Sequence, residues 1–545
     1  MKRTCYYIGI LIAIFLVSAC NSERTDPNRI FRMNMDVGVT SLDPAFARNQ
    51  MNVWCVNNLF NGLTQLDSNL QVRPCIAKSW EQSADGLLYT FHLRNDVYFH
   101  DHPQFPNGIG RKVLASDFVY SFRRIISPKT ISSGAWIFND KVKDSSAFYA
   151  LNDSTFCVQL SKPFPAFPSL LSIQYCSVVP KEICEYYGKD FRNNPVGTGP
   201  FKFSYWKESE VMCFVKNEKY FEFENGIRLP KIDAVKITFI SDKQTAFLEL
   251  LKGNLDFFSG IDGSYRNDVL NKSGELKDKH KARFNLIKSA YLNTEYLGML
   301  VDSSIQIVKN SPLKDKRIRQ AINYAIDREK MIRYLQNSIG NPGHAGFLPK
   351  GMPGYDEKKI KGYSYNPAKA RALLAAAGYK DGNGLPEITL NTTSTYRDLI
   401  EYVQKELSRV GIKSKVEVHQ GSSLRELISK NNVNFFRGSW IADYPDAENY
   451  LAVFYSKNFV PNGPNYTHFS NKKFDALFEK TFYENNDSIR FSMYQELENI
   501  VLDEAPMVIL YYDQSVRLLP KNVHGLSSNA LNLLDLKRVY KVTEN

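Results

Sequence analysis

The sequence predicts an α/β protein that is divided into more than one domain. A chain of 545 residues is longer than one hydrophobic core usually grows, so two or three domains are expected. From Arg29 to about Val215 the pattern is mostly short strands and turns, whereas from about Pro312 helices and strands alternate. Such alternation is typical of α/β folds, in which ligands bind at the carboxyl ends of the strands.

The composition is that of a globular protein with a mixed surface charge. Hydrophobic residues make up 43% of the chain and charged residues 23%, which is normal for a protein with large buried cores. The formal net charge of +12 favours anionic surfaces or acidic ligands. Lysine and arginine are dispersed among aspartate and glutamate without a dense basic block, so no nucleic-acid partner is expected.

The first residues form a targeting segment that is excluded from the fold. A basic start at Lys2 precedes an apolar stretch at 6–17, which is too short to span a bilayer comfortably. Small residues before Cys20 resemble a bacterial lipoprotein signal, in which this sulfur carries the lipid. We therefore expect a signal peptide at 1–19 and a lipidated tether at 20–29 that anchors the protein to a membrane. A plain secretory signal with an incidental cysteine is the alternative.

Apart from Cys5 and Cys20, the chain has six cysteines, which all lie in its N-terminal part: Cys55, Cys75, Cys157, Cys176, Cys184 and Cys213. An exported protein permits disulfides, but the spacing assigns no pairing. Buried free thiols are an equally good interpretation. The CxxC pattern is absent, so a zinc knuckle is not expected.

The N-terminal part is predicted to hold strands and one clear helix. The helix covers 117–125, because Phe118, Phe122 and Ile125 share one face, and Ser116 is its expected N-cap. The predicted strands lie at 88–93, 96–99 and 155–160, and a glycine–proline turn at 196–201 opens a further strand pair.

Helices and strands alternate in the C-terminal part. Asn366 and Pro367 form a helix start, and Gly378 lies just past the end of that helix. The predicted helices lie at 315–334, 367–377, 396–410 and 424–428, and the predicted strands at 388–392 and 416–418.

The stretch at 434–446 carries the candidate site. An apolar, β-prone run leads to Arg437, a small-residue break, Trp440 and Asp443. A cation and an anion near the end of one strand suit a ligand that carries both charges, such as a short peptide zwitterion. An ordinary structural ion pair between Arg437 and Asp443 is the alternative.

Motifs of common enzymes are absent from the sequence. It contains no GxxxxGK[ST], GxGxxG, HExxH or GxSxG pattern, and no cofactor is expected. His100 and His102 could offer imidazoles to a metal, but an exposed polar loop is the preferred interpretation and no metal site is expected. Asp443 and Asp446 could in principle do acid/base work.

Several short segments occur in an order that resembles the oligopeptide- and dipeptide-binding proteins of bacterial ABC importers, solute-binding protein family 5. The segments are Thr40–Pro44, Asn58–Leu63, Ala115–Phe122, Gly197–Phe201, Asp315–Ile322, Tyr365–Tyr379 and Trp440–Asp443. The resemblance covers nearly the whole mature chain, and it implies a two-lobed periplasmic-binding-protein clamshell (type II, large variant) with an extra domain inserted in lobe one. It places lobe one at 30–60, 186–295 and 511–545, the inserted subdomain at 61–185 and lobe two at 296–510.

The resemblance also implies a function and a set of binding residues. The protein would bind short peptides as extended strands and deliver them to a permease that is powered by a separate ATPase. Asp443 would bind the peptide α-amino group, and Arg437 would meet the terminal carboxylate. The segment with Arg48, Asn49 and Gln50 would supply backbone partners, and the cleft would be walled by Trp440, Tyr444, Tyr511 and Tyr512. We expect a monomer on the periplasmic or extracytoplasmic face of a bacterial membrane. The alternatives are an oligosaccharide or metal-chelate ligand, or a secreted hydrolase that uses Asp443 and Asp446.

Overall fold

A computed structural model of the chain describes residue 26 and residues 29–261 and 265–542. The predicted signal peptide, Cys20 and most of the predicted tether lie outside these described residues. Within the described ranges, no helix is both long and apolar enough to cross a membrane.

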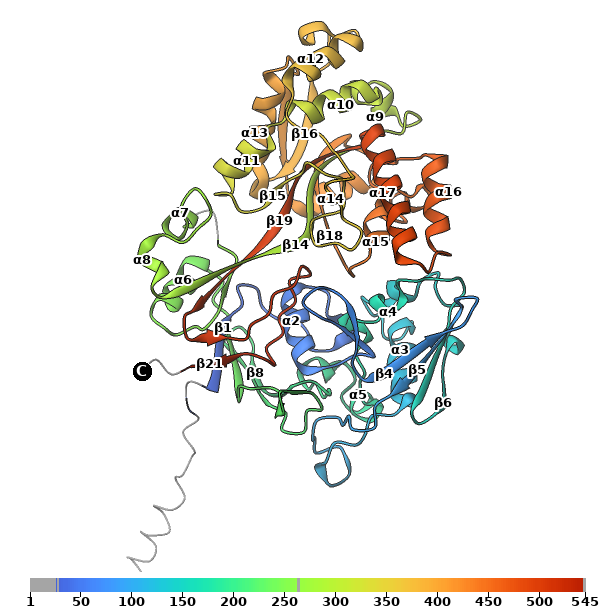
Figure 1. The fold of residues 1–545 in the computed structure, drawn as a ribbon, viewed down its shortest axis with the longest axis vertical. Helices are drawn as coiled ribbons and strands as arrows, with labels where there is room; N and C mark the ends of the chain where they lie inside the picture. Colours follow the sequence, from blue (N-terminus) through green and yellow to red (C-terminus); the bar gives the residue numbers. More distant parts are fainter. Residues whose placement is uncertain (1–25, 27–28, 262–264, 543–545) are drawn as a thin grey trace, which may run out of the picture.

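Lobe one is built on a four-stranded sheet with the order β1-β12-β9-β8 (Figure 1). The strands are β1 (Ile30–Asn34), β8 (Phe201–Lys207), β9 (Val211–Lys216) and β12 (Ala234–Thr238). β1 and β12 are parallel, and the other pairs are antiparallel. Helix α2 (Gln50–Leu59) packs into the same core, where Trp54 meets Phe257 edge to face with 5.9 Å between the ring centroids.

The predicted glycine–proline turn packs against the end of α2. A Cβ on Gly197 would lie 2.1 Å from the Leu59 carbonyl oxygen, so a larger residue would collide with the backbone. His100 secures this turn from the other side. Its ring contacts the Gly199 oxygen at 3.0 Å and the Gly197 nitrogen at 3.3 Å. Both ring nitrogens of His100 therefore serve the fold.

The inserted subdomain carries a second four-stranded sheet with the order β4-β5-β7-β6. The strands are β4 (Ala77–Gln82), β5 (Leu88–Leu93), β6 (Phe148–Asn152) and β7 (Thr155–Gln159), and α3 (Ala115–Ile126) covers them. The strand predicted at 96–99 is wrong, because only an isolated bridge between Tyr98 and Lys112 forms there. The N-cap prediction for Ser116 is also wrong: α3 begins at Ala115, and Asp117 accepts the Leu114 amide at 2.8 Å.

Lobe two is an α/β layer around a larger sheet with the order β13-β19-β14-β18-β16-β17. The strands are β13 (Phe258–Ser259), β14 (Phe284–Met299), β16 (Ile388–Thr393), β17 (Ser414–His419), β18 (Phe435–Ile441) and β19 (Met507–Pro520), and β15 (Asn341–Pro342) pairs with β19. The helices are α10 (Lys316–Ala325), α11 (Arg328–Leu335), α12 (Pro367–Ala376), α13 (Arg397–Ser408), α14 (Gly421–Ser429), α15 (Ala447–Leu451), α16 (Lys472–Thr481) and α17 (Asp487–Glu504).

The single helix predicted at 315–334 is wrong, because the structure has α10 and α11 in its place. The break comes at Asp327, whose carboxylate caps α11 by accepting the Lys330 amide at 3.0 Å. The buried Arg328 guanidinium fixes the break by donating to the carbonyls of Asn323 and Ile326 at 2.9 and 3.3 Å.

Strands β14 and β19 connect the two bodies of the molecule. They pair antiparallel from Phe284 opposite Pro520 to Gly298 opposite Met507, with register shifts on the way. Figure 1 shows both strands running from the body with β1, β8 and α2 to the body with α10, α13 and α17. The predicted lobe boundaries at 295/296 and 510/511 fall inside these strands.

The six cysteines from Cys55 to Cys213 are all free thiols, and they form no disulfide within the described residues. Five of them are buried, and Cys213 is partly exposed. Burial raises the pKa of Cys75 to about 12, so this thiol stays neutral. The structure thus favours the interpretation that the cysteines are core residues.

Candidate functional site

The chain that leaves β18 reaches the region where lobe two meets the inserted subdomain. Tyr444 is buried there against Phe164, with 6.4 Å between the ring centroids, and Phe164 also packs on Phe482 of lobe two. The Tyr444 hydroxyl donates to Glu448. Tyr444 therefore lies in the packed contact between the lobes, next to the predicted amine receptor Asp443.

Asp443 is held by Asn449, a residue that sequence reasoning missed. The Asn449 amide nitrogen donates to Asp443 Oδ2 at 3.2 Å, and its oxygen accepts the Asp443 backbone amide at 3.3 Å. The same oxygen accepts Trp440 Nε1 at 3.3 Å. The available signal was the start of α15, where Asp446 caps the helix and places Asn449 in the first turn.

The Asp443 carboxylate has no cation within ion-pair distance among the described residues. The surrounding protein raises its pKa by burial, and the Asn449 hydrogen bond opposes that shift. Solvent still reaches the residue as a whole, so water screens part of the burial effect. Asn449 thus positions this carboxylate, and no cation of the described residues neutralises it.

Lobe one brings Arg48 toward the same place. Burial raises the pKa of Tyr175, which the inserted subdomain contributes, and the charges of Asp443 and Arg48 act on this hydroxyl in opposite directions. The Asp443 carboxylate of lobe two and the Arg48 guanidinium of lobe one therefore both lie near this tyrosine. Arg48 is exposed and forms no ion pair with the described residues.

The side chains of Asn49 and Gln50 have structural partners. Asn49 caps α2 by accepting the Asn52 amide at 2.9 Å. The Gln50 side-chain amide donates to the Asn532 carbonyl at 3.3 Å, and the Trp54 indole N–H donates to the same carbonyl at 2.7 Å. These bonds fix the 48–51 segment against the C-terminal part of the chain.

Arg437 has an internal partner, which the sequence did not reveal. Its guanidinium forms an ion pair with the buried Glu295 and lies over the Tyr396 ring, 3.3 Å from the centroid. Burial raises the Glu295 pKa and Arg437 opposes this shift, as expected for a buried pair. Asn293 links Glu295 to Asp513 at 3.2 and 3.3 Å. Arg437 is thus not a free receptor for a ligand carboxylate.

The predicted aromatic wall is only partly placed at the site. Trp440 is half-buried, and its carbonyl accepts the Tyr450 hydroxyl at 3.0 Å. Tyr512 lies in the core of lobe two and donates to the Gly346 carbonyl at 2.6 Å. Tyr511 is buried near Glu295 and Tyr396. The structure therefore brings Trp440 and Tyr444 close to Asp443 but gives both Tyr511 and Tyr512 core positions.

Asp446 has a structural role. The Arg490 guanidinium lies 3.2 Å from one carboxylate oxygen, and the Tyr494 hydroxyl donates to the other at 2.8 Å. Asp446 also accepts the Glu448 amide as the cap of α15. A carboxylate with all these bonds is poorly suited to be the second member of an acid/base pair with Asp443.

The chain is an α/β protein whose two lobes are joined by long shared strands. It holds a carboxylate without an ion-pair partner among the described residues where the lobes meet. These features together define the class of hinged solute-binding proteins. The chain belongs to the bacterial extracellular solute-binding proteins of family 5, whose model for the middle region matches residues 71–462.

Three similar proteins illustrate the range of this fold. The dipeptide-binding protein DppE of Bacillus subtilis (strain 168) is 26% identical over 539 residues, which cover 95% of this chain and 93% of DppE. The ABC transporter-associated periplasmic binding protein DppA of Helicobacter pylori, solved with the peptide STSA, has a TM-score of 0.74 at 24% identity, covering 94% of this chain and 98% of DppA. NikZ of Campylobacter jejuni, solved with Ni(L-His), has a TM-score of 0.71 at 26% identity, and the match covers 95% of this chain and 100% of NikZ.

Proposed function

We propose that this protein binds short peptides between its lobes and delivers them to the permease of an ABC importer. Asp443 is the proposed receptor for the peptide α-amino group. The observation that carries the proposal is the state of this carboxylate: Asn449 positions it, and no cation of the described residues neutralises it. An ammonium that reaches it gains a charge-assisted hydrogen bond in a partly desolvated place.

The segment at 48–51 and the backbone near Trp440 are proposed to pair with the peptide backbone. Backbone pairing tolerates different side chains, because every peptide presents the same amide pattern. β14 and β19 would act as the hinge, and ligand contacts made by both lobes would shift the molecule toward a closed state. Trp440 and Tyr444 are the proposed aromatic neighbours of the ligand.

Export and anchoring belong to the same proposal. We infer that Cys20 carries the lipid after removal of residues 1–19, so that a monomer is held on the extracytoplasmic side of a bacterial membrane. The sequence contains no phosphate-binding loop, so a separate ATPase would power transport. The name of DppE and the peptide bound to DppA support a peptide as ligand.

The test is to identify what the purified protein carries. Native mass spectrometry should detect co-purifying peptides, and mixtures of short peptides should raise the thermal unfolding midpoint. Recovery of intact peptides after long incubation is expected for a binding protein. Cleaved peptides would support the hydrolase alternative, and the absence of any stabilisation by peptides would contradict the proposal.

A metal chelate is the second candidate, because NikZ was solved with Ni(L-His). The described residues contain no group of three or more histidine, cysteine, aspartate or glutamate side chains that could hold a metal. A chelate would thus have to bring its own ligands. Stabilisation by Ni(L-His), but not by peptides, would favour this candidate, and stabilisation by oligosaccharides alone would favour a sugar ligand.

A further inference from the structure

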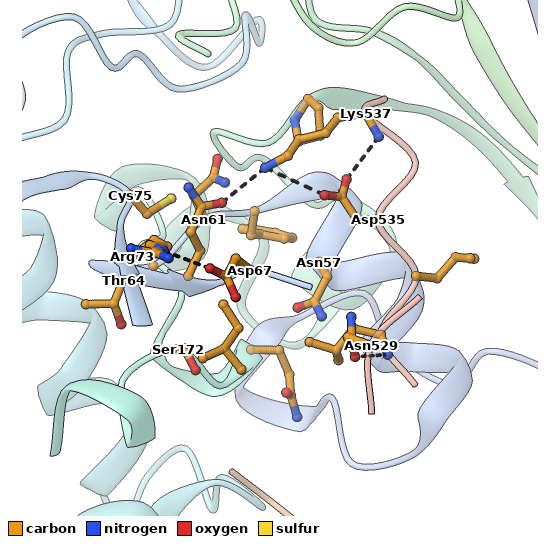
Figure 2. A pocket seen from close by; sticks show the side chains of 18 of the residues that line it. Asn57, Asn61, Thr64, Asp67, Arg73, Cys75, Ser172, Asn529, Asp535 and Lys537 are labelled. Atoms are coloured by element: carbon orange, nitrogen blue, oxygen red, sulfur yellow. Dashed lines mark hydrogen bonds and ion pairs between the residues drawn. The ribbon is translucent and has the colours of Figure 1, made fainter. Parts of the chain in front are cut away.

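A cavity of about 400 Å³ lies in lobe one and the base of the inserted subdomain (Figure 2). Its walls come from α2, the segments around residues 60–75 and 172–177, and the C-terminal segment at 527–538. No residue of 296–510 lines it, and neither does any residue predicted to bind the peptide. The volume is within the range of small-molecule sites. A ligand here would be held without the participation of lobe two.

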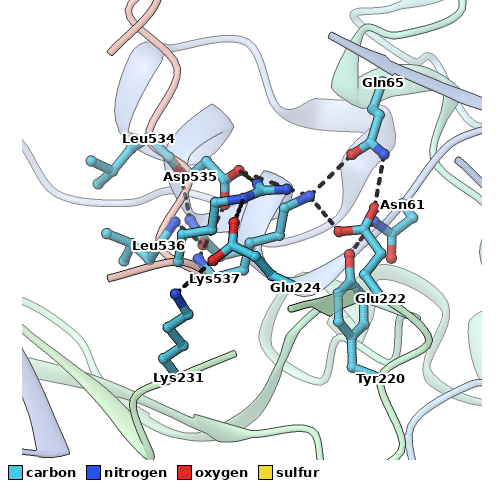
Figure 3. Close-up of polar contacts among 12 residues, drawn as sticks. Asn61, Gln65, Tyr220, Glu222, Glu224, Lys231, Leu534, Asp535, Leu536 and Lys537 are labelled. Carbon is cyan, nitrogen blue, oxygen red and sulfur yellow. Dashed lines mark hydrogen bonds and ion pairs between the residues drawn. The ribbon is translucent and has the colours of Figure 1, made fainter. Parts of the chain in front are cut away.

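Each charged side chain in the wall of this cavity has an ion-pair partner; Figure 3 shows the partners around Lys537 and Asp535, and Figure 2 shows Arg73 with Asp67. Lys537 is buried, and in addition to its ion pair its ammonium group donates a hydrogen bond to the Gln65 side chain at 3.1 Å. The pairs are Lys537–Glu222, Arg538–Glu224, Arg538–Asp535 and Arg73–Asp67, at 2.7, 2.9, 3.2 and 2.8 Å. An ionic ligand would have to lose water without an unpaired counter-charge, or break one of these pairs.

Several neutral polar side chains of the wall have no side-chain hydrogen-bond partner among the described residues, and Asn57 and Ser177 are two of them. Asn57 and Ser177 both line the cavity, and Ser177 is only 6% exposed. Figure 2 shows the Asn57 carboxamide projecting between Asp67 and Asn529. The adjacent Asn58 behaves differently, since it donates to the carbonyls of Trp54 and Leu534 at 2.7 and 2.9 Å.

The two neighbouring asparagines therefore have different roles: Asn58 is used by the fold, and Asn57 is available to bind a ligand. Asn58 ties α2 to the C-terminal segment, whereas Asn57 offers a donor and an acceptor to the cavity. A polar group in such a place normally binds water or a ligand. The aromatic side chains of Phe60 and Tyr220 add apolar surface to the same wall.

We propose that this cavity binds a neutral, hydroxyl-rich small molecule, of the size of a mono- or disaccharide, through Asn57 and Ser177. Hydroxyl groups both donate and accept, so they match a carboxamide and a serine hydroxyl without disturbing the paired charges. Binding would not require movement of lobe two. The site is separate from the proposed peptide site, and either one could exist without the other.

The test uses the purified chain and defined probes. Glucose and maltose at millimolar concentration should bind in saturation-transfer NMR and raise the thermal unfolding midpoint, while acetate, phosphate and ammonium should not. Asn57→Leu should lower the sugar affinity about tenfold or more, and Ser177→Ala about threefold or more. Asn383→Leu, at an exposed position of lobe two, is the matched control and should change nothing.

Three results would overturn the proposal. They are the absence of binding by both sugars, tighter binding of the charged probes than of the sugars, and unchanged sugar affinity in both cavity variants. Circular dichroism establishes that each variant is folded. If Asn57→Leu does not fold, the sugar affinity of Ser177→Ala alone tests the proposal. Peptide binding is expected to persist in both cavity variants, which separates this result from the outcome for the proposed function.

Discussion

Asn449 holds Asp443 from two directions: its amide nitrogen donates to the carboxylate at 3.2 Å, and its amide oxygen accepts the Asp443 backbone amide at 3.3 Å. The same oxygen accepts the Trp440 indole at 3.3 Å. The carboxylate and the indole are therefore oriented by one side chain before a ligand arrives. Such preorganisation lowers the ordering cost of binding.

Replacing Asn449 by leucine should weaken peptide binding although Asn449 itself is not proposed to contact the peptide. The substitution removes the bonds that orient Asp443 and Trp440 while keeping a similar size. A loss of about 1–3 kcal/mol, or roughly fivefold to 150-fold in affinity, is expected by calorimetric titration. Asn432→Leu, an exposed carboxamide of lobe two, is the control. Unchanged affinity in Asn449→Leu would show that Asp443 does not need this support.

Replacing Asp443 by asparagine tests the proposed amine receptor directly. The carboxamide keeps the shape but loses the charge, so peptide binding should weaken by about 2–5 kcal/mol. Acetylation of the peptide amino terminus should weaken binding to the unaltered protein in a similar way. Because burial raises the pKa of Asp443, affinity should fall as acidification protonates this carboxyl. If neither change alters the affinity, Asp443 is not the receptor.

The sequence was a good guide to elements with strong local patterns. The helix predicted at 396–410 is α13, and the capped helix after Asn366 is α12, since periodicity and capping are local properties. The sequence patterns failed where a partner that is distant in the sequence determines the local structure. Arg328 breaks a helix by bonding to carbonyls, and it also reaches the Ile509 carbonyl.

The same limit applies to the site. Arg437 and Asp443 are close in sequence, but the partner of Arg437 is Glu295 on β14, which no spacing within 434–446 could reveal. Asn449 was missed because no local pattern shows that this side chain of α15 returns to Asp443 and Trp440. The free Asp443 carboxylate could be proposed from its position at the strand end, whereas its lack of a partner required the three-dimensional structure.

The Glu295–Arg437 pair predicts that the terminal carboxylate of a peptide contributes little to binding. Glu295 already neutralises the guanidinium, and Tyr396 covers its face. A peptide with an amidated carboxyl terminus should therefore bind within about threefold of the free acid. Glu295→Gln should release Arg437 and create a preference for the free acid. A tenfold or larger loss on amidation in the unaltered protein would instead return Arg437 to the role of carboxylate receptor.

Glu498 predicts a dependence of stability on pH in lobe two. This α17 carboxyl is buried, accepts the Leu348 amide at 2.8 Å, and has its pKa raised to about 8 by burial. The folded protein then binds the proton more tightly than the unfolded chain, whose carboxyl titrates near its ordinary value. The free energy of unfolding should therefore fall as the pH rises from the ordinary carboxyl range through about 8.

Glu498→Gln should remove this loss, because the carboxamide stays neutral at every pH. Relative to the unaltered protein, the variant should gain about 1–3 kcal/mol in urea unfolding at alkaline pH and differ by less than about 1 kcal/mol under mildly acidic conditions. Glu496→Gln, an exposed position on the same helix, is the matched control and should show no such pH dependence. An equal effect of Glu498→Gln at both pH values would mean that packing, rather than the buried charge, sets the stability of this helix.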